Sequence, residues 1–384
     1  MHYITDIASL TEFCDRLRGQ PSLALDTEFS TRSTYYPRLR LVQLRAGEHS
    51  AVVDCYRVPS LGPVLELLYD PAVEKVVHAG RQDLAAFVRL TGKVPHPVFD
   101  TMIAGSLLGY GAQASYQLLV ERLLGKRIAK GHAASDWDRP ELSPAQLRYA
   151  HEDVLWLPEI AEKLKTQLGE LGRTCWLQEE MARTAAPAYY LPAEPDQQYL
   201  RIKERSALSR RALVLLRELA AWREREAQEQ DRPRNWVIPD GGLASLARRT
   251  ASRRSPEAAD LLPEYHQYLP GLREAALRAW ERLAEPVAAA APAPKEDGLL
   301  ELLLAFVRAR CLEAEVAPTV VATRDDVQAL CQAGNGEPKL PLLEGWRREL
   351  IGQDLLALLS GELMLGVDRE SGRILATPRP RAGG

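Results

Sequence analysis

Cysteine is scarce in this sequence, and no CxxC pair occurs. An odd number of widely spaced thiols argues against a disulfide framework and against a zinc knuckle. We therefore expect reduced thiols that pack as small hydrophobic side chains. The five cysteines are Cys14, Cys55, Cys175, Cys311 and Cys331.

Long apolar runs and a dominant charge are also missing. No stretch approaches the roughly 18 apolar residues of a membrane-spanning helix. The first residues lack the basic and apolar regions of a secretory signal. We therefore expect a cytoplasmic protein with no membrane partner. The net charge of −3 does not by itself indicate a nucleic-acid binder. Local charge is more informative, because acidic and basic surfaces can share one chain.

The chain length of 384 residues exceeds what one hydrophobic core usually organises, so we expect several domains. Hydrophobic residues make up 46% and charged residues 26%, which are ordinary values for folded proteins. The pattern predicts an α/β domain with a mixed sheet at residues 1–190. Two small all-α domains should follow at 199–285 and 298–370, separated by an alanine/proline linker at 286–297. The tail 371–384 is expected to be disordered.

The first domain begins with three β-rich segments joined by short turns, which predicts an antiparallel meander. Helices and a buried strand then alternate, which is typical of crossover connections onto a mixed sheet. A mostly helical stretch begins with Ser143 as N-cap and Pro144 at its first position, and Pro158 should kink or break it. The predicted strands cover residues 22–29, 39–47, 49–58 and 73–80, and the predicted helices 61–70, 83–92 and 143–172.

The helical part follows a proline-rich linker at 186–198 and begins with a helix at 208–230. The two helical blocks look like divergent copies of one unit. Residues 201–254 carry fourteen basic and seven acidic side chains, whereas the second block is acidic on balance. The first block is therefore the better candidate for contacting RNA phosphates. The alternative is a solvated arginine-rich helix with glutamate partners. The second block would close the molecule or contact a partner.

Two carboxylates lie close together on the first predicted strand. Asp26 and Glu28 are two residues apart in LALDTEF, so strand alternation places both on one face. Taken alone, such a pair is more often a solvated edge or half of a salt bridge. Partial burial beside Phe29 would instead make two like charges costly unless a cation neutralises them.

Further candidate residues follow later in the first domain. Asp83 begins a helix after a buried strand, and its alternative role is a charge at the helix N-terminus. Tyr149 and Asp153 are four residues apart and share a helix face. Four carboxylates and a tyrosine fit two-metal phosphodiester hydrolysis. Because the unperturbed tyrosine pKa is near 10, Tyr149 would orient the attacking water and would not serve as a base.

These motifs carry a resemblance to a known superfamily. DTEF, HAGRQD and YAHED resemble the three motifs of DEDD exonucleases, and the tyrosine four residues before Asp153 resembles their tyrosine branch. Arg148 stands where the histidine branch would have its histidine. TYYPRLRLVQL, SDWDRP, WREREA and GWRRELIG are similar to the bacterial ribonuclease D family. The acidic residue usual near KGHAASDW in that family is replaced by His132 and alanines.

The resemblance implies an RNase H-like exonuclease domain followed by two HRDC-like domains. It implies hydrolysis of RNA from the 3′ hydroxyl end, with release of nucleoside 5′-monophosphates, in the 3′ processing of transfer-RNA precursors. The enzyme would act as a monomer. Two divalent ions, Mg²⁺ or Mn²⁺, would be held by Asp26, Glu28, Asp83 and Asp153. Substrate contacts are expected from Gln43, His78, Tyr36 and Arg40.

Two other functions remain open at this point. One is a DNA-directed 3′→5′ exonuclease, because nothing in the sequence distinguishes ribose from deoxyribose. The other is a nucleic-acid-binding scaffold without catalysis, which a missing carboxylate would have favoured.

Several of these side chains also have a structural interpretation. His78 could equally be a buried, hydrogen-bonded histidine, and His151 points away from the face of Tyr149. Tyr35 and Tyr36 would stack on a base or pack in a core. Trp137 is expected to anchor packing near the active-site helix.

Overall fold

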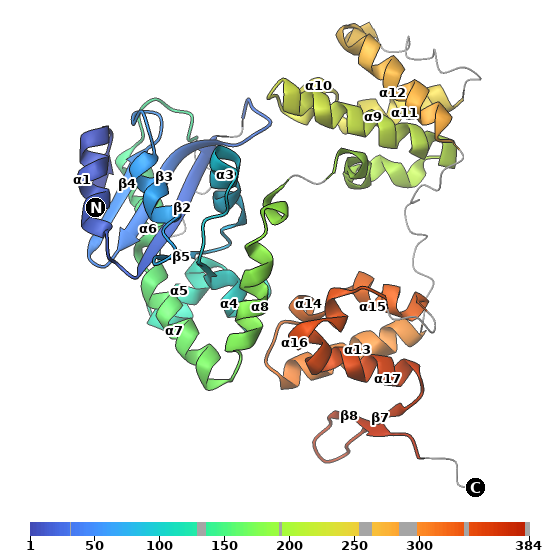
Figure 1. Ribbon diagram of the computed structural model, residues 1–384. Helices are drawn as coiled ribbons and strands as arrows, with labels where there is room; N and C mark the ends of the chain where they lie inside the picture. Colours follow the sequence, from blue (N-terminus) through green and yellow to red (C-terminus); the bar gives the residue numbers. More distant parts are fainter. Residues whose placement is uncertain are drawn as a thin grey trace. The chain divides into compact units, whose positions relative to one another are not determined.

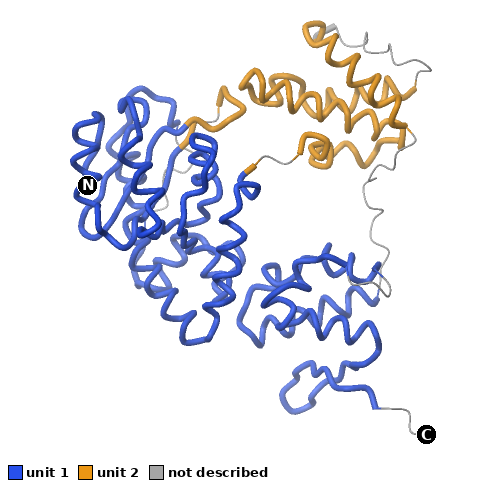
Figure 2. The backbone as a smooth tube through the Cα atoms, in the orientation of Figure 1, with its two compact units in different colours: residues 1–28, 39–190, 296–384 blue, residues 29–38, 191–295 orange. Residues whose placement is uncertain are grey.

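The computed structural model describes residues 1–30, 32–128, 136–191, 194–252, 263–283, 298–333 and 338–380. It consists of two compact units (Figure 2). The first unit contains residues 1–28, 39–190 and 296–384, and the second contains residues 29–38 and 191–295. The segment 29–38 therefore packs with the first helical block, although its neighbours in sequence are strands of the sheet in the first unit.

A six-stranded mixed sheet forms the core of the N-terminal part of the first unit (Figure 1), with the order β1-β4-β3-β2-β5-β6. Strands β3 and β4 are antiparallel, whereas β1 is parallel to β4 and both β2 and β6 are parallel to β5. The predicted mixed sheet is confirmed, but the two short outer strands were not predicted. The strands are β1 His2–Ile4, β2 Ser22–Ser30, β3 Arg38–Ala46, β4 His49–Asp54, β5 Glu74–Val77 and β6 Val98–Asp100.

Helices cover both faces of this sheet, and strand alternation divides the core between them. Leu23 and Leu25 of β2 pack with side chains of α1, α2 and α3, whereas Ala24 packs with side chains of α4, α5 and α7. The face of Ala24 is also the face of Asp26 and Glu28, because side chains two residues apart point the same way. The helices are α1 Ile7–Leu17, α2 Gly62–Leu68, α3 Arg81–Thr91, α4 Thr101–Ser106, α5 Tyr116–Leu124, α6 Pro144–Leu155, α7 Leu157–Glu170 and α8 Thr174–Thr184.

The long helical stretch after residue 143 has the predicted start and break. Ser143 caps α6 with a capping box completed by Gln146, and Pro144 takes the first helical position. The helix ends at Leu155 with Trp156 as its C-cap, and Pro158 lies in the first turn of α7. Both predictions from proline and serine chemistry are confirmed.

The second unit is helical. Its longest helix is α9 Arg210–Glu229, capped by Ser209, which confirms the helix predicted at 208–230. Trp222 and Tyr268 meet edge to face in its core, with ring centroids 5.7 Å apart. The predicted linker at 186–198 contains the short 3₁₀ turns η1 Pro187–Tyr190 and the start of η2. The remaining elements are η2 Pro195–Arg201, η3 Lys203–Ala207, α10 Arg234–Val237, α11 Asp240–Ala251, η5 Pro263–Tyr268 and α12 Leu269–Glu281.

The C-terminal block ends differently from the prediction. Helices were expected up to residue 370 and disorder from 371, but the strands β7 Leu363–Val367 and β8 Ile374–Pro378 form an antiparallel hairpin. The linker predicted at 286–297 lies outside the described residues. The preceding elements are α13 Gly298–Glu313, α14 Pro318–Val321, α15 Arg324–Gln332, η6 Pro341–Leu343, α16 Gly345–Arg347, the π-helical turn η7 Arg348–Gly352 and α17 Gln353–Leu359.

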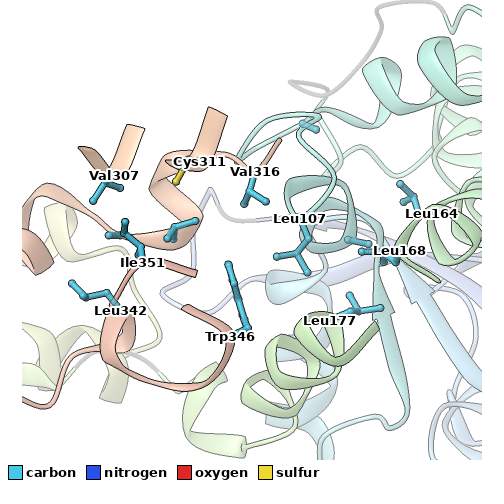
Figure 3. Close-up of a cluster of buried hydrophobic side chains, with 14 of the residues drawn as sticks. Leu107, Leu164, Leu168, Leu177, Val307, Cys311, Val316, Leu342, Trp346 and Ile351 are labelled. Atoms are coloured by element: carbon cyan, nitrogen blue, oxygen red, sulfur yellow. The ribbon is translucent and has the colours of Figure 1, made fainter. Parts of the chain in front are cut away.

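This C-terminal block shares a hydrophobic core with the N-terminal α/β domain of the first unit (Figure 3). Leu107 and Leu177 belong to the same buried cluster as Val316, Trp346 and Ile351. Trp346 is 1% exposed, and its ring stacks on Trp176 with the centroids 4.6 Å apart. The block is thus an integral part of the first unit.

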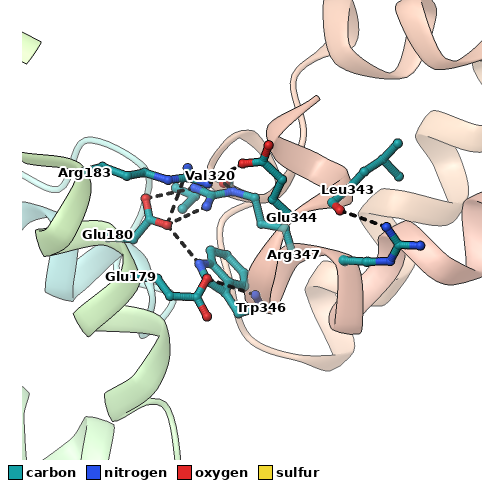
Figure 4. A network of polar contacts seen from close by, with 9 residues as sticks. Glu179, Glu180, Arg183, Val320, Leu343, Glu344, Trp346 and Arg347 are labelled. Atoms are coloured by element: carbon teal, nitrogen blue, oxygen red, sulfur yellow. Dashed lines mark hydrogen bonds and ion pairs between the residues drawn. The ribbon is translucent and has the colours of Figure 1, made fainter. Parts of the chain in front are cut away.

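Polar contacts between α8 and α16 accompany this core (Figure 4). The indole of Trp346 donates a hydrogen bond of 2.9 Å to Glu180. Arg347 forms a bidentate ion pair with the same carboxylate, and Arg173 donates hydrogen bonds to the carbonyls of Leu107 and Ala314. Among the described helices, none combines the length and apolar character that a bilayer crossing requires.

Candidate active site

Three carboxylates meet on the α6 side of the sheet. Asp26 and Glu28 project from β2, and Asp153 projects from the last turn of α6. One oxygen atom from each can be chosen so that all three lie within 4.8 Å of one another. Strand alternation places Asp26 and Glu28 on one face of β2, and the fold brings Asp153 of α6 to the same place.

Asp83 lies beside this group, in the first turn of α3 after β5. It is 8% exposed, and its carboxylate accepts a hydrogen bond from the hydroxyl of Thr27. Its charge is one of those that raise the pKa of Asp26. Asp83 is therefore electrostatically part of the cluster, although the three-oxygen group does not include it.

The crowded carboxylates hold their protons unusually strongly. Burial is the largest cause in every case, and neighbouring carboxylates add to it. The pKa of Asp26 is raised well above its ordinary value, that of Glu28 to about 8 and that of Asp153 to about 7. Burial also raises the pKa of Asp83 to about 6, against the opposing effect of the Thr27 hydrogen bond.

Tyr149 adjoins the cluster through Asp153, and their hydrogen bond lowers the pKa of Asp153. Burial and then the charge of Asp153 raise the pKa of the Tyr149 phenol above its ordinary value. The phenol therefore keeps its proton at neutral pH. Trp137 is 5% exposed and its ring centroid lies 6.5 Å from that of Tyr149, so the predicted packing anchor is confirmed.

Two of the predicted substrate contacts lie inside the protein. Gln43 is fully buried, and its amide makes no hydrogen bond within the described part of the chain. Arg40 is 1% exposed and forms an ion pair with Asp54, while its Nε donates a 3.1 Å hydrogen bond to the carbonyl of Trp137. Both substrate contacts remain predictions, and the use of Arg40 within the fold argues against its contact.

The other predicted contacts also have structural partners. His78 Nδ1 lies 2.9 Å from the hydroxyl of Thr101, and burial lowers the pKa of His78 to about 4. In the second unit, the backbone N–H of Tyr36 donates a 3.0 Å hydrogen bond to Asp231. Contacts of His78 and Tyr36 with substrate remain predictions. His132 lies outside the described residues.

His151, which we expected to be structural, points away from the cluster. Its Nε2 lies 2.8 Å from the hydroxyl of Ser50 on β4.

Comparison with known proteins gives a consistent result. Residues 1–169 match the 3'-5' exonuclease family, and residues 212–255 match the HRDC domain. Ribonuclease D of Granulibacter bethesdensis is 39% identical, with 97% of this chain and 96% of that protein covered. Ribonuclease D of Pseudomonas paraeruginosa is 37% identical, with coverages of 94% and 97%.

The chain belongs to the ribonuclease D family. It is therefore a hydrolase of the 3′→5′ exoribonuclease class. The crystal structure of Escherichia coli RNase D is similar over 94% of this chain and 98% of that one, with a TM-score of 0.75 and 27% identity. The match to one HRDC domain confirms a helical domain of that kind in the second unit, and the C-terminal HRDC-like domain remains a prediction.

Asp100 supports the turn before Asp83 in this ribonuclease D chain, and the sequence did not reveal this contact. Its two carboxylate oxygens accept 3.0 Å hydrogen bonds from the backbone N–H groups of Ala79 and Gly80, in the turn that leads into α3 and Asp83. Ala79 has a positive φ of 53°, and a side chain at Gly80 would meet Val77 at 2.5 Å. Asp100 is the last residue of β6, a strand of only three residues, so no sequence signal marked it.

The donor set of this ribonuclease D site fits divalent cations of the hard type. Mg²⁺ and Mn²⁺ prefer oxygen ligands, and the site offers carboxylates without sulfur or imidazole. The raised pKa values are a second indication, because like charges this close are stable in ionised form only when a cation neutralises them. Asp26, Glu28 and Asp153 would hold such ions, with Asp83 beside them.

We expect the Mn²⁺ affinity of this cluster to fall as the pH is lowered from about 8 to about 6. A carboxyl must lose its proton before it binds a cation, and Glu28 and Asp153 hold theirs up to pKa values of about 8 and about 7. Calorimetric titration in two buffers of different ionisation enthalpy would measure both affinity and proton release. An affinity that is constant over this range would contradict the prediction.

The raised pKa values of these carboxyl groups also make the stability of the metal-free protein depend on pH. The folded chain binds more protons than the unfolded chain, so these groups favour folding at low pH. That contribution is lost as the pH rises through about 8, the pKa of Glu28.

Proposed function

We propose that this chain removes nucleotides one at a time from the 3′ hydroxyl end of RNA and releases nucleoside 5′-monophosphates. Its proposed cellular role is the 3′ processing of transfer-RNA precursors. The observation that carries the proposal is the group of Asp26, Glu28 and Asp153 oxygens on an exonuclease fold. The relative from Escherichia coli is described as an exoribonuclease involved in structured RNA processing, which supports RNA as the substrate.

Asp26, Glu28, Asp153 and Asp83 are proposed to hold two divalent ions, Mg²⁺ or Mn²⁺. When bound, these ions supply charge neutralisation and activate water for attack on the phosphodiester. Asp26 interacts with all the other carboxylates of the cluster. After burial, the charges of Asp83, Asp153 and Glu28 raise its pKa.

Tyr149 is proposed to position the attacking water. Its phenol keeps its proton, because burial and the charge of Asp153 raise the tyrosine pKa. The phenol can therefore donate one hydrogen bond and accept another. These hydrogen bonds would orient the attacking water without removing a proton from it. Asp153 holds the phenol in place through their shared hydrogen bond.

The second unit is proposed to supply much of the RNA affinity through its basic side chains. The C-terminal block, residues 298–370, is proposed to be a second HRDC-like domain whose role is to complete the first unit. We further propose a monomer that works in the reducing cytoplasm, which the free thiols of Cys14, Cys55, Cys175, Cys311 and Cys331 support.

The substrate proposal predicts faster degradation of RNA than of DNA. Matched single strands, and a transfer-RNA precursor with a 3′ extension, would be incubated with the full chain and Mg²⁺ or Mn²⁺. We expect a ladder that shortens from the 3′ end on RNA and nucleoside 5′-monophosphates as the product. A 3′-phosphorylated RNA serves as the control that should resist. Faster removal of DNA would identify the chain as a DNA exonuclease.

A further inference from the structure

A cavity of about 340 Å³ lies within the second unit, and it is not part of the carboxylate site. Its volume is at the lower end of the range for small-molecule sites, about 300–1,000 Å³. Two separate parts of the chain form it, namely the segment 29–38 and the first helical block. Its lining residues are Thr34, Tyr35, Gln198, Arg201, Ile202, Arg223, Pro233, Arg234, Asn235 and Asp240.

The lining is positive on balance, because it contains three arginines and one carboxylate. Asp240 is already paired with Nη1 of Arg223 at 2.8 Å. Arg234 is held by the buried carboxylate of Glu224 at 2.9 Å. Arg201 is exposed, and its side chain makes no ion pair within the described residues. The cavity therefore offers cationic groups to an anionic ligand.

Arg223 carries one hydrogen-bond donor, its Nε, that no protein group among the described residues uses. The residue is 3% exposed, and Nη1 makes its hydrogen bonds, to Asp240 and to the carbonyl of Ile238. Its Nε has no partner in the part of the chain that the structure describes. An unpaired buried donor raises the free energy of the folded protein. Binding of a ligand that brings acceptor oxygens to this guanidinium would therefore be favourable.

The fixed aromatic side chain of Tyr35 adds a second kind of contact. Its hydroxyl donates to Glu224, its ring packs edge to face against Tyr36 at 4.7 Å, and Arg234 lies 5.5 Å from its centroid. Aromatic rings beside a positive groove bind single-stranded nucleic acid by stacking, and guanidinium groups bind phosphate through paired N–H donors.

From these observations we infer that the cavity binds a phosphate of the RNA strand together with its adjoining nucleotide. Arg201 and Arg223 contact the phosphate, Asn235 offers its amide, and Tyr35 packs on the base. This inference rests on the proposed RNA substrate and names a binding site for it apart from the carboxylates. It also gives the segment 29–38, which directly follows Glu28 in sequence, a role in substrate binding.

The test compares two single arginine substitutions in the full chain, each removing one exposed charge from the same block. Arg201 lines the cavity, whereas Arg225 lies on α9 outside it. On an Asp26→Asn background, which prevents cleavage, R201Q should weaken binding of a single-stranded RNA about tenfold. It should also lower the slope of log affinity against log salt by about 0.7. R225Q should leave the affinity within about twofold of its parent.

A variant that keeps the positive charge distinguishes a direct hydrogen-bonded contact with phosphate from nonspecific electrostatic attraction. R201K should recover only part of the affinity, because lysine lacks the paired donors of a guanidinium. In the active chain, R201Q should raise KM for RNA and leave kcat unchanged. Equal losses in R201Q and R225Q would overturn the inference, as would full recovery in R201K.

The source of the phosphate is tested with adenosine 5′-monophosphate and inorganic phosphate. If either binds in an Arg201-dependent way while the RNA affinity does not change, the cavity takes free phosphate compounds and the inference is wrong. Because binding is measured without cleavage, this outcome is distinct from failure of the proposed activity, which would appear as an intact RNA substrate in the parent chain.

Discussion

Asp26→Asn should lower the rate of RNA hydrolysis roughly a thousandfold or more, because the ions contribute several kcal/mol and each 1.36 kcal/mol is a factor of ten. The amide has the shape of the carboxylate but lacks its charge. Asp26 is the group whose pKa is raised by Asp83, Asp153 and Glu28 together. Its removal should therefore weaken Mn²⁺ binding as well as catalysis. Steady-state rates on a 3′-tailed RNA and Mn²⁺ titrations would measure both effects.

Two controls separate this loss from a folding defect. RNA affinity should stay close to that of the parent, and in the absence of metal the variant should be at least as stable, because one member of a repelling cluster has been neutralised. Asp15→Asn, at an exposed position on α1, should change neither rate nor metal affinity. Persistent hydrolysis by Asp26→Asn after exhaustive metal removal would falsify the mechanism.

Tyr149→Phe provides a graded comparison with Asp26→Asn. It removes a hydroxyl and leaves all four carboxylates, so kcat should fall by about a hundredfold or less while Mn²⁺ affinity changes little. A loss of metal affinity as large as that of Asp26→Asn would assign Tyr149 to ion binding.

Part of the carboxylate site was predictable, because the direction of side chains within one strand or one helix depends on local periodicity. Asp26 and Glu28 share a face through the alternation of one strand, and Tyr149 and Asp153 through one helical turn. Ser143 and Pro158 likewise determine where α6 begins and where it ends through short-range chemistry.

The features that were missed depend on contacts between distant residues. Arg40 is in a strand pattern like that of a surface residue, yet it is buried against Asp54 and Trp137. Asp100 supports the turn before Asp83 from a strand of three residues. The sequence pattern indicated helix and disorder where β7 and β8 form a hairpin. The strands are formed by pairing with each other, and local propensity alone did not reveal this.

The attachment of the C-terminal block is the largest of these long-range features, and Trp346→Ala should disrupt it. Trp346 is 1% exposed, stacks on Trp176 and donates a hydrogen bond to Glu180. Replacing a buried tryptophan with alanine costs about 3–5 kcal/mol through lost burial and the cavity left behind. Hydrogen exchange should show loss of protection in both α16 and α8, since the two helices are joined by this side chain.

Trp236→Ala is the matched control, because Trp236 is 54% exposed and belongs to the second unit. Its substitution should change stability by no more than about 0.5 kcal/mol and leave α8 protected. If Trp346→Ala opened the C-terminal block while α8 kept its full protection, the block would be an independent domain that merely touches the exonuclease. Loss of protection in both would mean that residues far from the carboxylates, near the end of the chain, help to hold the catalytic domain in its folded form.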